Sequence, residues 1–326
     1  MQIRDIYQIA QFCRNNKIKN IYMFVHKNPD ADALGSAYAL SAFLERYGFF
    51  TKIIIRNDFD DCNIFNIETT DYVGIEDFVA IFCDCSSPDR LENKLWKKAK
   101  YFIKIDHHEQ SDDDINYSLK YVDVQASSTC EIVASFLMEK PHIELDRSVY
   151  DGLYYGILTD TGEFTYALNN EKTFRILSWL IEKGAQYKIL HKYYNQKTQS
   201  SIRVHSYILK HMKIYRNKKI ALCEVNLNVA KLLNVLPKEF SRCVNLLANV
   251  DDAQMWCTIV EVKPNRYSIS LRSDELSTIN VEEIARKFGG GGHIHSAGCL
   301  LSKAKKDEFL KYIEKIFRSV DVWESL

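Results

Sequence analysis

Short apolar runs and helical patterns alternate along the first half of the chain. Four apolar runs predict β-strands, and they cover residues 20–25, 51–55, 78–83 and 101–105. From Ala33 to Tyr47 the apolar residues recur at three- and four-residue spacing, which predicts a helix between the first two strands. This alternation is typical of parallel β-α-β units, so the pattern predicts an α/β fold with a parallel sheet.

Polar side chains follow three of these strands at the point where each strand ends. The first strand runs into "HKNPDADALGS" (26–36), the third stops at Asp84 and the fourth stops at Asp106. In open α/β sheets, ligands bind beyond the carboxyl ends of the strands. We therefore expect one site here, to which "GILTDTGEF" also contributes. Its candidate residues are His26, Asp30, Asp32, Asp84, Asp106, His107, His108 and Asp160.

The second half of the chain has a different pattern. Residues 128–198 have a mostly helical pattern. Strand-like runs then return at 255–262 and 266–273, followed by a helical pattern that ends in four consecutive glycines. We expect two domains, 1–195 and 196–326, of which the smaller C-terminal one is also α/β.

Composition narrows the function. Lys plus Arg equals Asp plus Glu, at 43 each, whereas proteins that bind long nucleic acid usually carry a basic surplus. The balance favours short RNA or small nucleotides over long nucleic acid, although it can hide a local basic groove. No apolar run approaches the roughly 18 residues that a membrane span needs. The nine cysteines include no C-x-x-C pair, which is typical of reduced thiols in a cytoplasmic protein.

The acidic residues of the predicted site point to metal binding. Carboxylates gathered at one sheet edge repel each other unless protons or cations neutralise them. Carboxylates with imidazoles and without thiolates suit Mn²⁺ or Mg²⁺ better than a structural zinc site. Two ions about 3.5 to 4 Å apart stabilise an in-line displacement at phosphorus. Simpler interpretations exist for single residues, because an aspartate after a strand can be a helix N-cap and Asp160 can be a turn residue before Gly162.

These segments resemble the motifs of the DHH phosphoesterases. "HKNPDADALGS" matches the first motif of that family, roughly H-x-N-P-D-x-D-x-x-G-S, and Asp106-His107-His108 is the triplet that names the family. "GGGGHIHSAG" (289–298) resembles the glycine-rich motif of the DHH-associated C-terminal domain, although the family often has Ala-Ala-Gly where this chain has Ser-Ala-Gly. The layout as a whole is similar to that of the bacterial nanoRNase and pAp-phosphatase subfamily.

The resemblance implies a two-metal site that prefers Mn²⁺, with Mg²⁺ as the alternative, and a nucleophilic water between the ions. One ion would be held by His26, Asp30 and Asp84. The other would be held by Asp32, Asp84, His107 and Asp160, so that Asp84 bridges the two. His108 would face the substrate phosphate as a donor or general acid, and Asp106 would orient a histidine.

For the C-terminal domain, the resemblance implies substrate binding across a cleft between the two domains. The candidate residues are Arg272, Gly290, Gly291, Gly292 and His293. Consecutive glycines leave backbone N–H groups unshielded, so a loop of this kind can hold a phosphate, and arginine and histidine suit a terminal phosphate. A helix C-cap explains Gly289 without any ligand. Ser128 and Glu131 either contact the substrate or form a capping box.

The expected function is hydrolysis of short oligoribonucleotides to mononucleotides, of pAp to AMP, or both. A phosphodiesterase for linear or cyclic dinucleotides of the pApA type would use the same metal site. A non-catalytic RNA-binding module is the alternative from another class. Two other enzyme classes are less favoured. A family II inorganic pyrophosphatase shares the first domain but lacks the glycine-rich motif, and a RecJ-type exonuclease usually carries an extra nucleic-acid-binding domain. The sequence leaves the oligomeric state open, including a homodimer.

Overall fold

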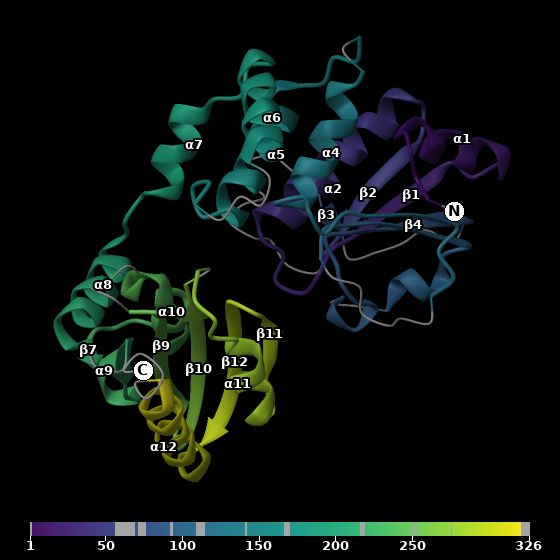
Figure 1. The fold of residues 1–326 in the computed structure, drawn as a ribbon. Helices are drawn as coiled ribbons and strands as arrows, with labels where there is room; N and C mark the ends of the chain where they lie inside the picture. Colours follow the sequence, from purple (N-terminus) through teal and green to yellow (C-terminus); the bar gives the residue numbers. More distant parts are fainter. Residues whose placement is uncertain are drawn as a thin grey trace. The chain divides into compact units, whose positions relative to one another are not determined.

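The computed structural model describes residues 2–55, 69–70, 76–91, 94–108, 115–140, 142–165, 170–215, 219–248, 250, 253–274 and 276–320. The chain forms two compact units, Met1–Asn195 and Gln196–Leu326. Each unit has its own sheet and its own helices (Figure 1).

The first unit is built on a parallel sheet of six strands. In spatial order these are β3 (Thr69–Thr70), β2 (Phe50–Ile54), β1 (Asn20–Phe24), β4 (Phe78–Cys83), β5 (Tyr101–Asp106) and β6 (Leu119–Val122). The predicted α/β fold is confirmed, and the ends of the four predicted strands agree within one residue. The short strands β3 and β6 are additions. The strand order reverses between β1 and β4, which makes the crevice at their carboxyl ends the expected ligand site.

Both faces of this sheet are covered, which explains why its strands have nearly continuous apolar sequences. On β1, Ile21 and Met23 belong to the large core, whereas Tyr22 and Phe24 pack on the opposite face in an aromatic cluster with Phe82. The helices of the unit are α1 (Tyr7–Asn15), α2 (Ala31–Arg46), α4 (Thr129–Met138), α5 (Arg147–Asp160), α6 (Asn170–Glu182) and α7 (Tyr187–Tyr194). Two short 3-10 helices cover Pro88–Arg90 and Leu95–Lys98.

Helices α2 and α5 approach each other so closely that only glycine fits between them. A Cβ atom on Gly35 would lie 2.5 Å from the carbonyl oxygen of Gly152 and 2.9 Å from the sulfur of Cys130. A Cβ atom on Gly156 would lie 3.1 Å from the Cα atom of Asp32. The glycine of "HKNPDADALGS" is therefore required by packing, and this packing brings α5 against the first turn of α2.

The second unit contains a mixed sheet of six strands. In spatial order these are β11 (Gly291–His293), β12 (Ser296–Ser302), β10 (Arg266–Ser273), β9 (Met255–Lys263), β8 (Ile220–Val225) and β7 (Lys213–Tyr215). Only β8 and β9 are parallel neighbours among these described strands. The helices are α8 (Gln199–His211), α9 (Leu227–Leu232), α10 (Pro237–Arg242), α11 (Val281–Lys287) and α12 (Lys303–Val320), with a 3-10 helix at Val244–Leu247.

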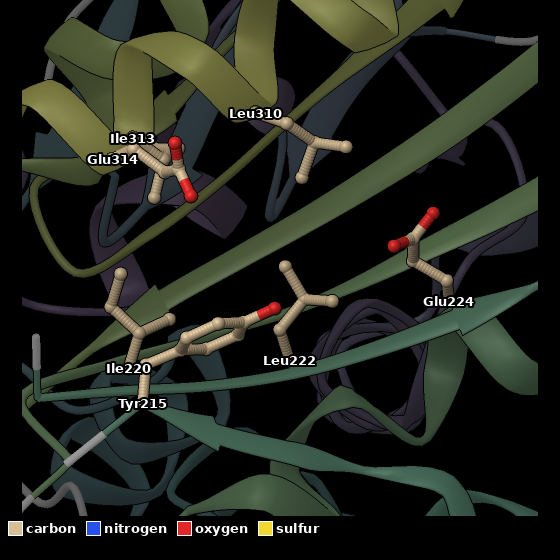
Figure 2. Close-up of a pocket in the computed structure, with 7 residues that line it drawn as sticks. All are labelled: Tyr215, Ile220, Leu222, Glu224, Leu310, Ile313 and Glu314. Carbon is tan, nitrogen blue, oxygen red and sulfur yellow. The ribbon is translucent and has the colours of Figure 1, made fainter.

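The two faces of the second sheet have different cores. Leu222, Leu271 and the residues of α11 and α12 form one core, and Trp256 with the residues of α8 and α10 forms the other. A cavity of about 120 Å³ lies between α12 and strands β7 and β8, and Figure 2 shows the residues that line it. It is lined by Tyr215, Ile220, Leu222, Glu224, Leu310, Ile313 and Glu314, so it contains none of the predicted site residues. Among the described helices, none has the length and apolarity to cross a membrane.

Candidate active site

The carboxyl ends of β1, β4 and β5 lie side by side because these strands are neighbours in the sheet. His26 lies two residues after β1, Asp84 directly follows β4, and His107 directly follows β5. The structure therefore brings together the predicted metal-binding residues of the first unit. Their donor atoms lie within 4.8 Å of one another in three groups: His26, Asp30 and Asp84; Asp84, His107 and His108; and Asp32, His107 and Asp160.

Asp84 is at the centre of this cluster. One of its carboxylate oxygens lies 3.6 Å from Nε2 of His26, and the other lies 3.5 Å from Nε2 of His107. The hydroxyl of Thr129 donates to the second oxygen at 3.1 Å, a contact from α4 that the sequence does not reveal. The backbone of Asp84 has φ of 53°, in the left-handed region that non-glycine residues rarely adopt. A strained backbone costs free energy and persists only where the surrounding structure holds it. Such positions are common at functional sites.

Backbone carbonyls fix the tautomers of two histidines. Nδ1 of His26 lies 3.0 Å from the carbonyl oxygen of Lys27, and Nδ1 of His107 lies 3.3 Å from that of Ala126. Because a carbonyl oxygen only accepts, Nδ1 carries the proton in each neutral ring. Nε2 then keeps its lone pair and points towards the carboxylates, as a metal-binding histidine requires.

Asp30 combines two roles. Helix α2 begins at Ala31, two residues earlier than the apolar pattern predicts, and Asp30 is its N-cap: Oδ1 accepts the N–H of Ala33 at 3.0 Å. The other oxygen, Oδ2, lies 3.6 Å from Nε2 of His26. The N-cap interpretation and the ligand interpretation are therefore compatible, because each uses a different oxygen of the same carboxylate.

Asp32 is buried in the first turn of α2, where it binds the start of α4. Its two oxygens accept the N–H groups of Thr129 and Cys130, at 2.8 and 2.7 Å. Burial and the charge of Asp84 nevertheless raise the pKa of Asp32 to about 7. Ser128 is the N-cap of α4 and accepts the N–H of Glu131. Only this half of the predicted capping box is observed, because the carboxylate of Glu131 instead accepts from the hydroxyl of Thr173 at 2.7 Å.

Asp160 is the last residue of α5, and its Oδ2 lies 3.5 Å from Nε2 of His107. Burial in the cluster and the charges of Asp32 and Asp84 raise the pKa of Asp160 well above its ordinary value. Burial would lower the pKa of His26, but its contacts with Asp30 and Asp84 outweigh that effect and raise the pKa to about 10. These shifts indicate that joint ionisation of the clustered carboxylates is unfavourable and that nearby cations favour it.

Asp106 lies behind the histidines. Its Oδ1 accepts the backbone N–H of His107 at 2.9 Å and contacts Nδ1 of His108 at 2.8 Å. Its Oδ2 lies 3.4 Å from the ammonium of Lys104, which donates to the carbonyl of Ser86 at 2.8 Å. Both members of this ion pair are buried. Lys104 is not among the residues predicted from the sequence, although a lysine inside an apolar strand is the signal that could have revealed it.

This set of donor atoms suits divalent metal ions. Imidazole and carboxylate ligands converge without a thiolate, and several of the carboxylates are buried and close together. Two divalent ions would neutralise the charge that raises the pKa values of Asp32 and Asp160.

In the second unit, the pairing of three strands brings the predicted polar residues together. Ser296 of β12 pairs with Arg272 of β10 on one side and with His293 of β11 on the other. Directly paired residues project from the same face of a sheet, so Arg272, Ser296 and His293 form one polar row. Trp256 of β9 pairs with Arg272 and extends this row. The cavity in Figure 2 lies on the opposite face of the sheet.

The expected glycine loop is in fact partly a strand. Gly289 follows α11 with φ of 79°, which agrees with the C-cap interpretation. A Cβ atom on Gly290 would lie 2.1 Å from the carbonyl oxygen of Gly298, and one on Gly292 would lie 2.3 Å from that of Ser296. Hairpin packing thus explains these glycines without a ligand. Gly291 differs, because a Cβ atom there would meet nothing within 4 Å.

Comparisons with known proteins agree with this architecture. Residues 20–157 match the DHH family, N-terminal domain, and residues 224–319 match the DHHA1 domain, so the two matches cover more than two thirds of the chain. The chain belongs to the DHH family. Its glycine-rich hairpin lies within the DHHA1 match, and the candidate metal-binding residues other than Asp160 lie within the DHH match.

Individual relatives support the same assignment. The chain is 27% identical, over 90% of its length and 93% of the relative's, to the probable bifunctional oligoribonuclease and PAP phosphatase NrnA of Streptococcus mutans. It is 22% identical to the cyclic-di-AMP phosphodiesterase GdpP of Bacillus subtilis, over 90% of this chain and 47% of that protein. The crystal structure of an exopolyphosphatase-related protein from Bacteroides fragilis shares the fold, with a TM-score of 0.81, 22% identity, and coverage of 98% and 97% of the two chains.

Proposed function

We propose that this DHH-family chain is a two-metal phosphoesterase that hydrolyses short oligoribonucleotides to mononucleotides, pAp to AMP, or both. The observation that carries the proposal is the position of Asp84, whose two oxygens face His26 on one side and His107 on the other. A carboxylate in this position suits a bridge between two ions. The similarity to a relative named as an oligoribonuclease and PAP phosphatase supports this substrate class.

The ligand sets that we propose are those that the DHH motifs imply. His26, Asp30 and Asp84 would hold one ion, and Asp32, Asp84, His107 and Asp160 would hold the other. The first set is one of the three donor groups, and the second contains another of them, Asp32, His107 and Asp160. Mn²⁺ is the ion that we propose, with Mg²⁺ as the alternative, because the donors are oxygen and imidazole nitrogen. Such ions, when bound, lower the pKa of a water and neutralise phosphoryl oxygens.

The remaining residues of the first unit position a proton donor. The contact between Nδ1 of His108 and Asp106 directs the other nitrogen, Nε2, away from the carboxylate. When both ring nitrogens carry protons, Nε2 can donate its proton to a phosphoryl or leaving-group oxygen, which is the role that we propose for His108. Asp106 holds the ring, and Lys104 neutralises Asp106. Thr129 fixes Asp84 through its hydroxyl.

The second unit would bind the substrate, so we assign catalysis to residues 1–195 and substrate binding to residues 196–326. Arg272 and His293 lie in one polar row, where a guanidinium and an imidazole suit a terminal phosphate. Gly291 is exposed and its missing side chain has no packing explanation, which fits close approach of a nucleotide to the backbone. Gly290 and Gly292 would shape the hairpin that presents it.

A phosphodiesterase for linear or cyclic dinucleotides is the second candidate. The similarity to a cyclic-di-AMP phosphodiesterase supports it, and the same metal site would perform the reaction.

We also propose a cytoplasmic location. The described cysteines are free thiols, most of them buried, and a reducing compartment keeps thiols in this state.

The test is a side-by-side hydrolysis assay with Mn²⁺ and Mg²⁺. The substrates are pAp, pApA, cyclic-di-AMP, a short RNA oligomer and pyrophosphate. Asp84→Asn should abolish nucleotide release, whereas Asp89→Asn, at an exposed aspartate outside the cluster, should leave it unchanged. If the wild type turns over none of the substrates but binds RNA, the chain is a binding module and the proposal fails.

A further inference from the structure

The charges of this chain are strongly segregated along the sequence. Between Glu182 and Glu224 there are 41 residues, Lys183–Cys223, without a single Asp or Glu. They include ten Lys or Arg and three His, which leaves the rest of the chain with 33 Lys and Arg against 43 Asp and Glu. The net charge of zero therefore hides a basic segment within an acidic remainder. We call Lys183–Cys223 the basic segment.

The structure shows that several of these cations lack carboxylate partners. Lys188, Lys192, Lys197 and Lys210 are exposed, and none forms an ion pair with a described residue. Lys188 and Lys192 are four residues apart on α7, a spacing at which like charges destabilise a helix. Burial and the charge of Lys197 lower the pKa of His205 on α8. This arrangement is unfavourable for the free protein, and a bound polyanion would relieve it.

Aromatic side chains accompany the exposed lysines on α7. Tyr187, Tyr193 and Tyr194 are 39%, 38% and 37% exposed, although tyrosine is large and usually more deeply buried. A cationic surface that also carries exposed tyrosines fits single-stranded nucleic acid, because lysines contact the phosphates and aromatic rings stack on unpaired bases. An acidic peptide would use the charges alone.

We propose that α7, the part of the basic segment that lies in the first unit, binds the phosphate backbone and bases of single-stranded RNA beyond the nucleotide that is being cleaved. This proposal rests on the proposed function for its choice of RNA over DNA, and it deepens that function by adding a surface for longer substrates. It also revises the expectation, based on total charge, that long nucleic acid is not a partner. The segment contains none of the metal-site residues, so binding and cleavage can be tested separately.

The experiment measures binding of a fluorescein-labelled 20-nucleotide single-stranded RNA to the full chain in EDTA, where cleavage is prevented. The combined variant Lys188→Gln and Lys192→Gln should bind at least about three-fold more weakly at physiological salt. The slope of log affinity against log salt should fall by about 1 to 1.5, since single strands contribute roughly 0.7 per lost phosphate contact. Cleavage of a dinucleotide should stay unchanged.

Two controls separate specific binding from general charge. Lys311→Gln with Lys315→Gln removes two exposed lysines, also four residues apart, from α12 and should leave RNA binding unchanged. Tyr193→Ala with Tyr194→Ala should weaken binding at least about five-fold without changing the salt slope, and Tyr193→Phe with Tyr194→Phe should restore it.

The proposal is overturned if the two-lysine variant of α7 binds the RNA like the wild type, or if the α12 variant loses as much affinity. It is also overturned if poly-glutamate competes as well as unlabelled RNA. Failure of the proposed function looks different, because the wild type would then bind the RNA in EDTA but cleave no substrate when divalent ions are added.

Discussion

The buried ion pair behind the DHH triplet allows a quantitative test. The side chains of Lys104 and Asp106 are 1% and 0% exposed, and their charged groups lie 3.4 Å apart. Oδ2 of Asp106 accepts no hydrogen bond from the described residues, so the ammonium is its neutralising neighbour. Lys104→Met keeps the length and apolar volume of the side chain but removes this charge.

The expected cost of this substitution follows from the geometry. At 3.4 Å and an effective dielectric constant of about 20, the attraction is about 5 kcal/mol. The variant also avoids burying an ammonium, which returns part of that energy, and breaking buried pairs typically costs about 3–5 kcal/mol. Because Oδ1 of Asp106 keeps its contacts with His107 and His108, we expect the lower end, a loss of about 3 kcal/mol in the free energy of unfolding.

The loss should depend on pH. Burial alone would raise the pKa of Asp106, but its hydrogen bond with His108 and the charges of His108 and Lys104 hold that pKa below its ordinary value. A carboxylate with a lowered pKa stabilises the fold above its unfolded pKa of about 4, and this contribution disappears as the pH falls through the folded pKa. The difference between wild type and Lys104→Met should therefore be largest near pH 7 and shrink towards pH 3.

Urea unfolding of the metal-free protein measures these quantities. Lys52→Met, at an exposed position of β2, is the matched control and should change stability by less than about 0.5 kcal/mol. In an Asp106→Asn background, Lys104→Met should lower the free energy of unfolding much less, because the carboxylate charge that Lys104 neutralises is already absent. A cost below about 0.5 kcal/mol in the wild-type background, or the same cost in both backgrounds, would refute this account of the pair.

Three further predictions test other parts of the structure. Gly35→Ala should lower the free energy of unfolding by about 1–3 kcal/mol in a urea titration, because its Cβ would lie 2.5 Å from a carbonyl oxygen; full stability would contradict the packing of α2 on α5. Gly290→Ala should destabilise the second unit through the same kind of clash, whereas Gly291→Ala should keep its melting temperature and raise KM; an unchanged KM would argue against backbone contact with substrate. Since the pKa of His26 is raised to about 10, the metal-free protein should lose stability as the pH rises from about 6.5 through 10, and affinity for divalent ions should increase over the same range; calorimetry showing pH-independent binding would exclude this proton release.

The strands and the site edge could be predicted from the sequence for physical reasons. Parallel strands buried on both faces have continuous apolar sequences, and their carboxyl ends meet at one edge, so His26, Asp84 and His107 were expected together. The short β3 and β6 could not be predicted, because two to four residues carry too little pattern.

Other features depend on contacts that are distant in sequence. Asp32 binds the amides of Thr129 and Cys130, more than 95 residues away, and no local pattern announces such a pair. The glycine run was predicted as a loop that can hold a phosphate, yet Gly290 and Gly292 are needed for close pairing with β12. Consecutive glycines look alike in sequence whether they serve a hairpin or a ligand, and only the neighbouring strand distinguishes them.

The central claim is that Asp84 joins two metal sites that act together in hydrolysis. We would titrate chelator-treated protein with Mn²⁺, count the bound ions by native mass spectrometry, and follow cleavage of a 5′-phosphorylated dinucleotide in the same samples. The account predicts two ions per chain, product formation that begins only with the second equivalent, and the loss of both in Asp84→Asn. Full activity with one ion, or in the chelated protein, would contradict it.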